Sequence, residues 1–129
     1  MGFHLTMKSL EERKAEMRKR TKAFASSVVR FYINLNKRHE ELRVLGRQLL
    51  RSGTSVAANY REGSRARSAD EFVAKVNLCS QEADESQLWL ELLRDDCGIC
   101  GPEVNSIWQE ADELIAIFVT MAKRVRSND

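Results

Sequence analysis

Apolar side chains recur at every third or fourth position in four separate stretches of the chain, which is the spacing of one buried face of an α-helix. The stretches span residues 17–35, 42–60, 72–93 and 104–125. No stretch alternates apolar and polar residues as a half-buried strand does. With short connections between them, the stretches predict an all-α fold, an antiparallel up-down-up-down four-helix bundle over residues 9–126. Residues 1–8 show no such period, and we expect a disordered N-terminal segment there.

Local residue patterns suggest where the helices begin. From Ser9 the chain becomes charged and helix-prone, and we expect a first helix of about 25 residues. Ser68 is followed three residues later by Glu71, the pattern of a capping box, so the third helix is expected to start there. Pro102 suits the first turn of the fourth helix.

The second helix is expected from about residue 40 to about residue 67, although it contains three glycines. Each glycine costs up to about 1 kcal/mol relative to alanine in a helix, so we expect close packing to compensate. The alternative is a break at Ser52–Gly53.

The polar side of this second helix carries a band of arginines. At about 100° per residue, five arginines fall within one narrow strip along the helix axis. They are Arg43, Arg47, Arg51, Arg61 and Arg65. Guanidinium groups bind phosphates as bidentate donors, so this band is a candidate surface for the backbone of RNA or DNA. The alternatives are a solvated face, or ion pairs with acidic residues of a neighbouring helix or subunit, namely Glu82, Asp84, Glu85 and Glu91.

Four polar residues near the apolar stripes form a second constellation. They are Asn59, Glu62, Glu82 and Glu85. Buried amides and carboxylates need partners, so we expect a buried polar network that fixes helix register or a subunit interface. A metal site is the alternative. It is disfavoured because neither histidine follows a glutamate at the three-residue spacing of a di-iron bundle.

Several apolar side chains lie outside the main stripes. They are Val29, Ile33, Leu78, Trp89 and Leu92. Apolar residues left outside a core usually mark an interface, so they are candidate oligomer contacts. A wide bundle core that absorbs them is the alternative.

Composition narrows the class of protein. The net charge of +2 is small, so the placement of charge says more about partners than its sum. Three cysteines and no apolar leader favour a cytoplasmic protein in a reducing compartment. No apolar run approaches the roughly 20 residues that span a membrane. Cys97 and Cys100 form a lone CxxC, which we interpret as a loop feature, with zinc shared between subunits as the alternative. We expect no cofactor and no enzymatic activity, because no nucleophile–histidine pair or phosphate loop is present.

One run of the second helix is similar to the signature of a known family. The run at residues 49–63 is LLRSGTSVAANYREG. It resembles bacterial four-helix-bundle proteins named for intervening sequences in large-subunit (23S) ribosomal RNA genes. The likeness continues through shorter segments and covers roughly residues 20–125; the segments include EADE at 82–85, WLELL at 89–93 and ADEL at 111–114.

This resemblance implies an antiparallel four-helix bundle that assembles as a ring, typically a homopentamer, without implying a settled activity. Relatives include the accessory variability determinant of diversity-generating retroelements, a basic barrel that binds nucleic acid and a reverse transcriptase. The leading expectation is therefore a non-enzymatic, oligomeric protein associated with RNA or DNA through the arginine face. The alternative is a scaffold that recruits a protein partner without contacting nucleic acid.

Overall fold

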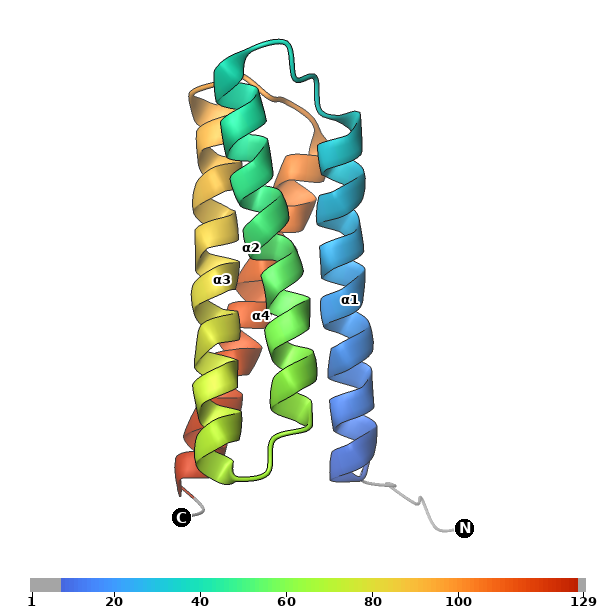
Figure 1. Ribbon diagram of the computed structural model, residues 1–129, viewed down its shortest axis with the longest axis vertical. Coiled ribbons are helices and arrows are strands. Elements are labelled where there is room, and N and C mark those ends of the chain that lie inside the picture. Colours follow the sequence, from blue (N-terminus) through green and yellow to red (C-terminus); the bar gives the residue numbers. More distant parts are fainter. Residues whose placement is uncertain (1–7, 128–129) are drawn as a thin grey trace, which may run out of the picture.

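The computed structural model describes residues 8–127, which form four helices. They are α1 (Leu10–Asn34), α2 (Glu40–Ser64), α3 (Ala69–Asp95) and α4 (Pro102–Ser127). Figure 1 shows that α1 and α3 run in one direction and α2 and α4 in the other, so the predicted all-α, up-down-up-down four-helix bundle is confirmed. The segment expected to be disordered, residues 1–8, lies outside the described residues except for Lys8.

The predicted helix starts follow from side-chain caps. The Ser9 hydroxyl accepts a hydrogen bond from the Glu12 N–H at 3.1 Å, and the Ser68 hydroxyl accepts one from the Glu71 N–H at 3.1 Å. The Glu71 carboxylate accepts from the N–H of Arg67 at 3.2 Å, one residue before the cap. These bonds satisfy backbone donors that have no partner inside the helix.

The glycines of α2 lie where neighbouring helices approach most closely. A Cβ on Gly53 would come within 2.8 Å of both methyl carbons of Val28 in α1, and a Cβ on Gly46 within 2.8 Å of Leu35 Cδ2. On the other side, a Cβ on Gly63 would meet Lys75 Cβ of α3 at 2.9 Å. The helix is continuous through the middle glycine, so the alternative of a break there was wrong. The helix ends at Ser64, slightly earlier than predicted.

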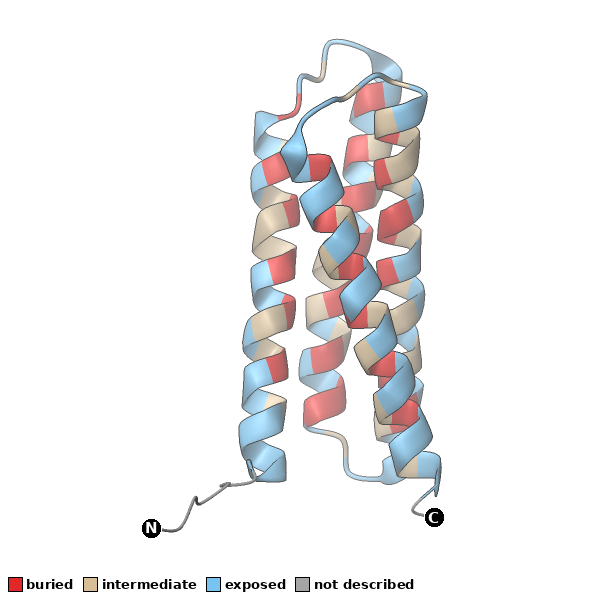
Figure 2. Ribbon diagram, turned by 180° about the vertical axis from the view of Figure 1, so that it is seen from behind, coloured by how far each residue is buried: buried red, intermediate tan, exposed pale blue. Residues whose placement is uncertain are grey.

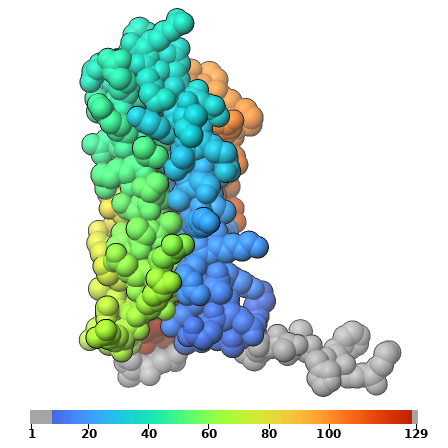
Figure 3. All heavy atoms as spheres, turned by 45° about the vertical axis from the view of Figure 1, so that its right-hand side comes forward, coloured from blue at the N-terminus to red at the C-terminus, as the bar shows by residue number. Residues whose placement is uncertain are grey.

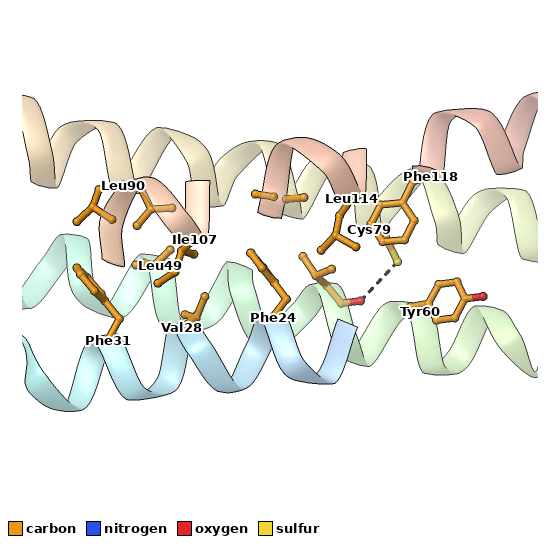
Figure 4. Packing of buried hydrophobic residues seen from close by; sticks show 14 of the residues in the cluster. Phe24, Val28, Phe31, Leu49, Tyr60, Cys79, Leu90, Ile107, Leu114 and Phe118 are labelled. Carbon is orange, nitrogen blue, oxygen red and sulfur yellow. Dashed lines mark hydrogen bonds between the residues drawn. The ribbon is translucent and has the colours of Figure 1, made fainter. Parts of the chain in front are cut away.

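The core runs the length of the bundle. Figure 2 shows the buried residues as stripes on the inward faces of all four helices. Phe24, Leu49, Leu90 and Phe118 are among the fully enclosed side chains, and Figure 4 shows them at different levels along the core, each from a different helix. The rings of Tyr60 and Phe118 stack with centroids 6.1 Å apart.

The four helices are not equally close to one another. α2 packs along both α1 and α3, and α3 packs along α4, whereas α1 and α4 make only sparse contact. Figure 2 shows α4 crossing the bundle so that it starts near α1 and ends farther from it. A bidentate pair from Arg20 of α1 to Glu110 of α4, at 2.9 and 2.7 Å, spans this seam. The molecule is therefore two hairpins, α1–α2 and α3–α4, joined chiefly through α2 and α3.

A glycine-to-alanine change normally stabilises a helix, but the close approach at Gly53 predicts that it lowers the free energy of unfolding here. Gly53→Ala gains helix propensity of up to about 1 kcal/mol. It also forces a methyl group against Val28, which is β-branched and fully buried. Overpacking of this kind costs about 1–3 kcal/mol, so we expect a net destabilisation of about 1 kcal/mol in urea unfolding at fixed protein concentration.

Two further variants make this prediction specific. Gly46→Ala meets the flexible end of Leu35 instead, so it is expected to destabilise the bundle less. Adding Val28→Ala to Gly53→Ala is expected to cost less than the sum of the two single changes, because the new methyl fills the space that Val28 leaves. Additive losses in the double variant would contradict the packing argument.

Candidate nucleic-acid interface

The structure divides the predicted arginine band into neutralised and open members. Arg43 donates to one Glu40 oxygen from Nε at 3.1 Å and from Nη2 at 2.7 Å. Arg51 reaches across to α3, with Nη1 3.2 Å from Glu82 and Nη2 3.1 Å from Glu85. The alternative of ion pairing with a neighbouring helix is thus realised at Arg51, while Arg43 pairs within its own helix.

The other three arginines of the band face outward. Arg47, Arg61 and Arg65 are exposed, and no carboxylate of residues 8–127 lies within 4.0 Å of their guanidinium nitrogens. Arg65 is the first residue after α2 rather than part of it. These three side chains therefore retain free donors for an anion.

α1 adds cations to the same surface. The Arg18 guanidinium donates from Nη1 to the Ser64 hydroxyl at 3.1 Å, and this hydroxyl donates to the Arg61 carbonyl at 2.8 Å. The contact sets Arg18 beside the last turn of α2. Lys22 lies one turn farther along α1 and is exposed. Neither cation has a carboxylate within 4.0 Å among the described residues.

We call this surface the basic face, and it comprises Arg18, Lys22, Arg47, Arg61 and Arg65. Figure 3 shows the side of the molecule where α1 and α2 lie next to each other and form one continuous surface. The sequence-based band missed Arg18 and Lys22 because it followed a single helix. The antiparallel register of α1 against α2, which places residue 18 beside residue 64, is the signal that could have found them.

Charge is divided between the two hairpins. Residues 1–67 contain 16 Lys and Arg against 6 Asp and Glu, whereas residues 68–129 contain 5 against 13. The small net charge of +2 is thus the sum of about +10 on one hairpin and about −8 on the other. The basic face lies on the positive hairpin, which raises the local potential for anions.

The four residues expected to form one buried polar network do not form one. Asn59 donates to the Ser55 carbonyl of its own helix at 3.0 Å, and Glu62 is exposed and pairs with Lys75 at 2.6 Å. Glu82 and Glu85 both pair with Arg51 at the edge of the α2–α3 seam. The prediction was wrong because these carboxylates lie at seam edges, where cations of the facing helix reach them.

The polar contact that is truly buried joins two serines. The hydroxyls of Ser52 and Ser86 lie 2.7 Å apart, and both residues are fully enclosed between α2 and α3. The Ser86 hydroxyl also donates to the Glu82 carbonyl at 2.9 Å. The sequence pattern assigned no role to the hydroxyl of Ser52 or to that of Ser86 on the facing helix.

The candidate interface residues occupy separate places. Ile33 on α1 and Leu78 on α3 have exposed side chains, at 66% and 40% of their full areas. Val29, Trp89 and Leu92 are half-buried, and Trp89 packs against the core. The Trp89 indole N–H is buried without an acceptor in residues 8–127. One chain does not test an oligomer interface, so this assignment and the pentamer remain predictions.

Within residues 8–127, no three side chains of histidine, cysteine, aspartate or glutamate lie close enough together to hold a metal ion. Cys97 and Cys100 lie in the loop after α3, and both are free thiols. Burial raises the pKa of the Cys79 thiol to about 12, and its sulfur contacts the Val56 carbonyl at 3.6 Å (Figure 4).

None of the helices in residues 8–127 combines the length and the apolar character needed to cross a membrane.

The fold and the site together define a class, namely a small all-helical bundle with a basic face on one hairpin. Residues 13–120 match the model of the 23S rRNA-intervening sequence protein family, and the chain belongs to that family. The resemblance noted in the sequence is thereby confirmed.

One solved relative shares the fold. It is the crystal structure of a protein of unknown function from the S23 ribosomal protein family of Bacteroides thetaiotaomicron VPI-5482. That protein is 33% identical, with a TM-score of 0.73 over 82% of this chain and 97% of its own. No functionally curated protein matches this chain.

The Arg51 contacts predict a pH-dependent effect on stability. Desolvation, followed by repulsion from Glu85, raises the pKa of Glu82, and Arg51 opposes both effects. Arg51→Met removes that opposition, so the pKa of Glu82 should rise further. A carboxyl with a raised folded-state pKa favours the native state at low pH and loses this advantage as pH rises through that pKa. We therefore expect Arg51→Met to cost about 1 kcal/mol at pH 7 and much less near pH 4.

Chemical unfolding at the two pH values measures this difference. Arg51→Met combined with Glu82→Gln should recover most of the loss at pH 7, because the desolvated charge is gone. Arg47→Met, which removes an unpaired arginine from the same helix, is the control and should change stability by less than about 0.5 kcal/mol. An Arg51→Met deficit that is equal at both pH values would contradict the assignment.

Proposed function

We propose that this protein is a non-enzymatic binder of the RNA or DNA backbone and that the basic face is its contact surface. The observation that carries the proposal is the presentation of five cations from two antiparallel helices with no carboxylate of residues 8–127 within 4.0 Å of them. Such a face attracts anions and leaves its donors available to them.

The chemistry of the face favours phosphate over bases. Arginine donates in a bidentate manner to phosphate oxygens, and lysine acts as a point charge on the same groups. Tyr60, the aromatic residue next to Arg61 in sequence, is buried and stacks on Phe118. Tyr32 of α1, which lies against Gly46 beside Arg47, is only half-exposed, and Lys37 lies over its ring at 4.5 Å. We therefore expect phosphate contacts rather than base stacking to dominate, so the binding should not depend on sequence.

Local structure supports a preorganised contact. The Arg18 guanidinium is tethered by the Ser64 hydroxyl, and the α2 helix is anchored on both sides by close packing. A rigid, tethered cation loses less side-chain entropy when it binds a phosphate. The name of the family links its members to 23S rRNA, which makes RNA the first ligand to test.

A salt-titrated binding assay with a short RNA duplex tests the proposal. Arg61→Gln/Arg65→Gln removes two open arginines, and we expect it to weaken binding by about tenfold or more at low salt. The slope of log K against log salt should fall by about 2, because roughly one counterion is released per phosphate contact.

The chain offers a matched control on the same helix. Arg43→Gln/Arg51→Gln removes the same charge from arginines that are already paired, so binding should change by no more than about twofold. Equal losses in the two double variants would show that only net charge matters. No retention of duplex RNA or DNA by the wild type at low salt would reject the proposed function outright.

A further inference from the structure

The open cations of the α1–α2 hairpin gather at the two ends of its outer face rather than along its middle. At the end drawn lowest in Figure 1, Arg61 lies in the last turn of α2 and Arg65 directly follows the helix. Arg18 of α1 is tethered to this end through Ser64, and Lys22 lies one turn farther along α1. We call Arg18, Lys22, Arg61 and Arg65 the lower cluster.

A second group of cations lies near the opposite end of the hairpin. The Lys37 ammonium lies over the ring of Tyr32, 4.5 Å from its centroid. Tyr32 borders the residue before Arg47, because a Cβ on Gly46 would come within 3.3 Å of the ring. No carboxylate of residues 8–127 lies within 4.0 Å of Lys37 or Arg47, and Glu40 is held by an arginine of its own helix. We call Lys37 and Arg47 the upper pair.

Between these two groups, the α1–α2 face carries no open charge. Residues 23–36 of the chain contain one charged side chain, Arg30, and it lines a hollow between α1 and α4. Residues 48–60 contain one, Arg51, and it is paired with two carboxylates of α3. The side chains that continue the helical spacing of the cations are small or apolar and are Ala25, Val29, Thr54 and Ala58. We call these four residues the waist.

The lower cluster and the upper pair are too far apart to share one phosphate. Arg47 and Arg61 lie 14 residues apart in one continuous helix, so their Cα atoms are about 21 Å apart at about 1.5 Å per residue. The close packing of α2 at Gly46, Gly53 and Gly63 holds this spacing. A ligand that uses both groups must therefore present phosphates at two places with a gap between them.

We infer that the ligand of this face is a double helix, and that the two strands flanking one of its grooves contact the lower cluster and the upper pair while the groove lies over the waist. This inference rests on the proposed function and names the kind of nucleic acid that the face accepts. A double helix holds two backbones at a fixed separation across each groove. The major groove of B-DNA is about 12 Å wide and admits one helix, so a face made of two adjacent helices spans a groove instead of entering it (Figure 3).

A single strand fits the same face less well. Its phosphates follow one another without a groove, so a strand that joins the two groups would place charge over the waist, where no cation neutralises it. Proteins that bind single strands usually stack the bases on aromatic side chains. Tyr32, the aromatic residue beside the upper pair, is half-exposed and has Lys37 over its ring. A flexible strand also loses more conformational freedom than a duplex when it is laid along a rigid surface.

Parallel salt titrations with a duplex of about 20 base pairs and an unstructured strand of about 20 nucleotides test the inference. The wild type should bind the duplex about tenfold or more tightly than the strand at low salt. Lys37→Gln/Arg47→Gln should weaken duplex binding by about tenfold and lower its salt slope by about 2, because one of the two strands loses its contact. The single strand, held mainly by the lower cluster, should lose no more than about twofold. RNA and DNA duplexes are separate arms, and the tighter one identifies the groove that is bridged, the wide minor groove of A-form RNA or the major groove of B-DNA.

A cation added to the waist distinguishes the two modes of binding. Ala58→Lys places an ammonium at an exposed position between the two groups. It should strengthen single-strand binding by about fivefold and steepen its salt slope by about 0.7, because the strand gains one phosphate contact. Duplex binding should change by no more than about twofold, since the groove lies over this position.

The control removes two exposed cations outside the face. Arg30→Gln/Arg124→Gln alters side chains that line hollows elsewhere on α1 and α4, and it should change the binding of either ligand by no more than about twofold. Circular dichroism of every variant checks that the bundle is retained. A control that weakens duplex binding as much as Lys37→Gln/Arg47→Gln would overturn the inference.

The two levels of the argument fail in different ways. Equal affinity of the wild type for duplex and strand, or an Ala58→Lys variant that strengthens both alike, would overturn the double-helix inference and leave backbone binding in place. Absence of binding to both ligands at low salt would instead reject the proposed function.

Discussion

The close approach of α2 to both of its neighbours is the constraint on which the rest of the structure depends. Gly53 admits Val28 of α1, and Gly63 admits the stem of Lys75 of α3. Next to Gly53, the hydroxyl of Ser52 shares a hydrogen bond with that of Ser86 of α3, and both serines are fully buried. A larger residue at any of these points would push a helix outward. Because the contacts occur on both sides of α2, they set the positions of α1 and α3 relative to each other.

That placement also decides which arginines are open. Arg51 lies on the α3 side of α2, close enough for Glu82 and Glu85 to reach it. Arg61 lies in the last turn of α2, where Ser64 joins Arg18 of α1 to the Arg61 carbonyl, and no carboxylate of residues 8–127 lies within 4.0 Å of the Arg61 guanidinium. Helix geometry places all five arginines in one strip, but the charged side chains of the helices on the two sides of that strip differ in sign. The face that remains basic is therefore a product of packing and not of the strip itself.

Much of the fold could be predicted from periodicity and caps, because both are local. The capping box at Ser68 and the four apolar stripes involve residues only a few positions apart. The site depends on contacts between distant residues, such as Arg18 with Ser64 and Ser52 with Ser86, which a helix-by-helix pattern does not contain. The same limit explains the failed polar network, since the partners of Glu62 and Glu82 come from the facing helix.

Part of the charge separation between the hairpins serves ion pairs within the molecule, but these pairs do not account for all of the charged residues. Among residues 8–127, the ion pairs that join distant parts of the chain all connect one hairpin to the other: Arg20 with Glu110 and Glu113, Arg51 with Glu82 and Glu85, and Lys75 with Glu62. These pairs are partly or fully exposed, so each contributes little to joining the hairpins. Attraction between the layers favours charges at the seams. It gives no advantage to cations that point away from the opposite layer, and their mutual repulsion lowers the stability of the monomer slightly. The ion pairs between the hairpins therefore do not account for the outward cations of the basic face, which are the groups that the proposed contact with a phosphate backbone would use.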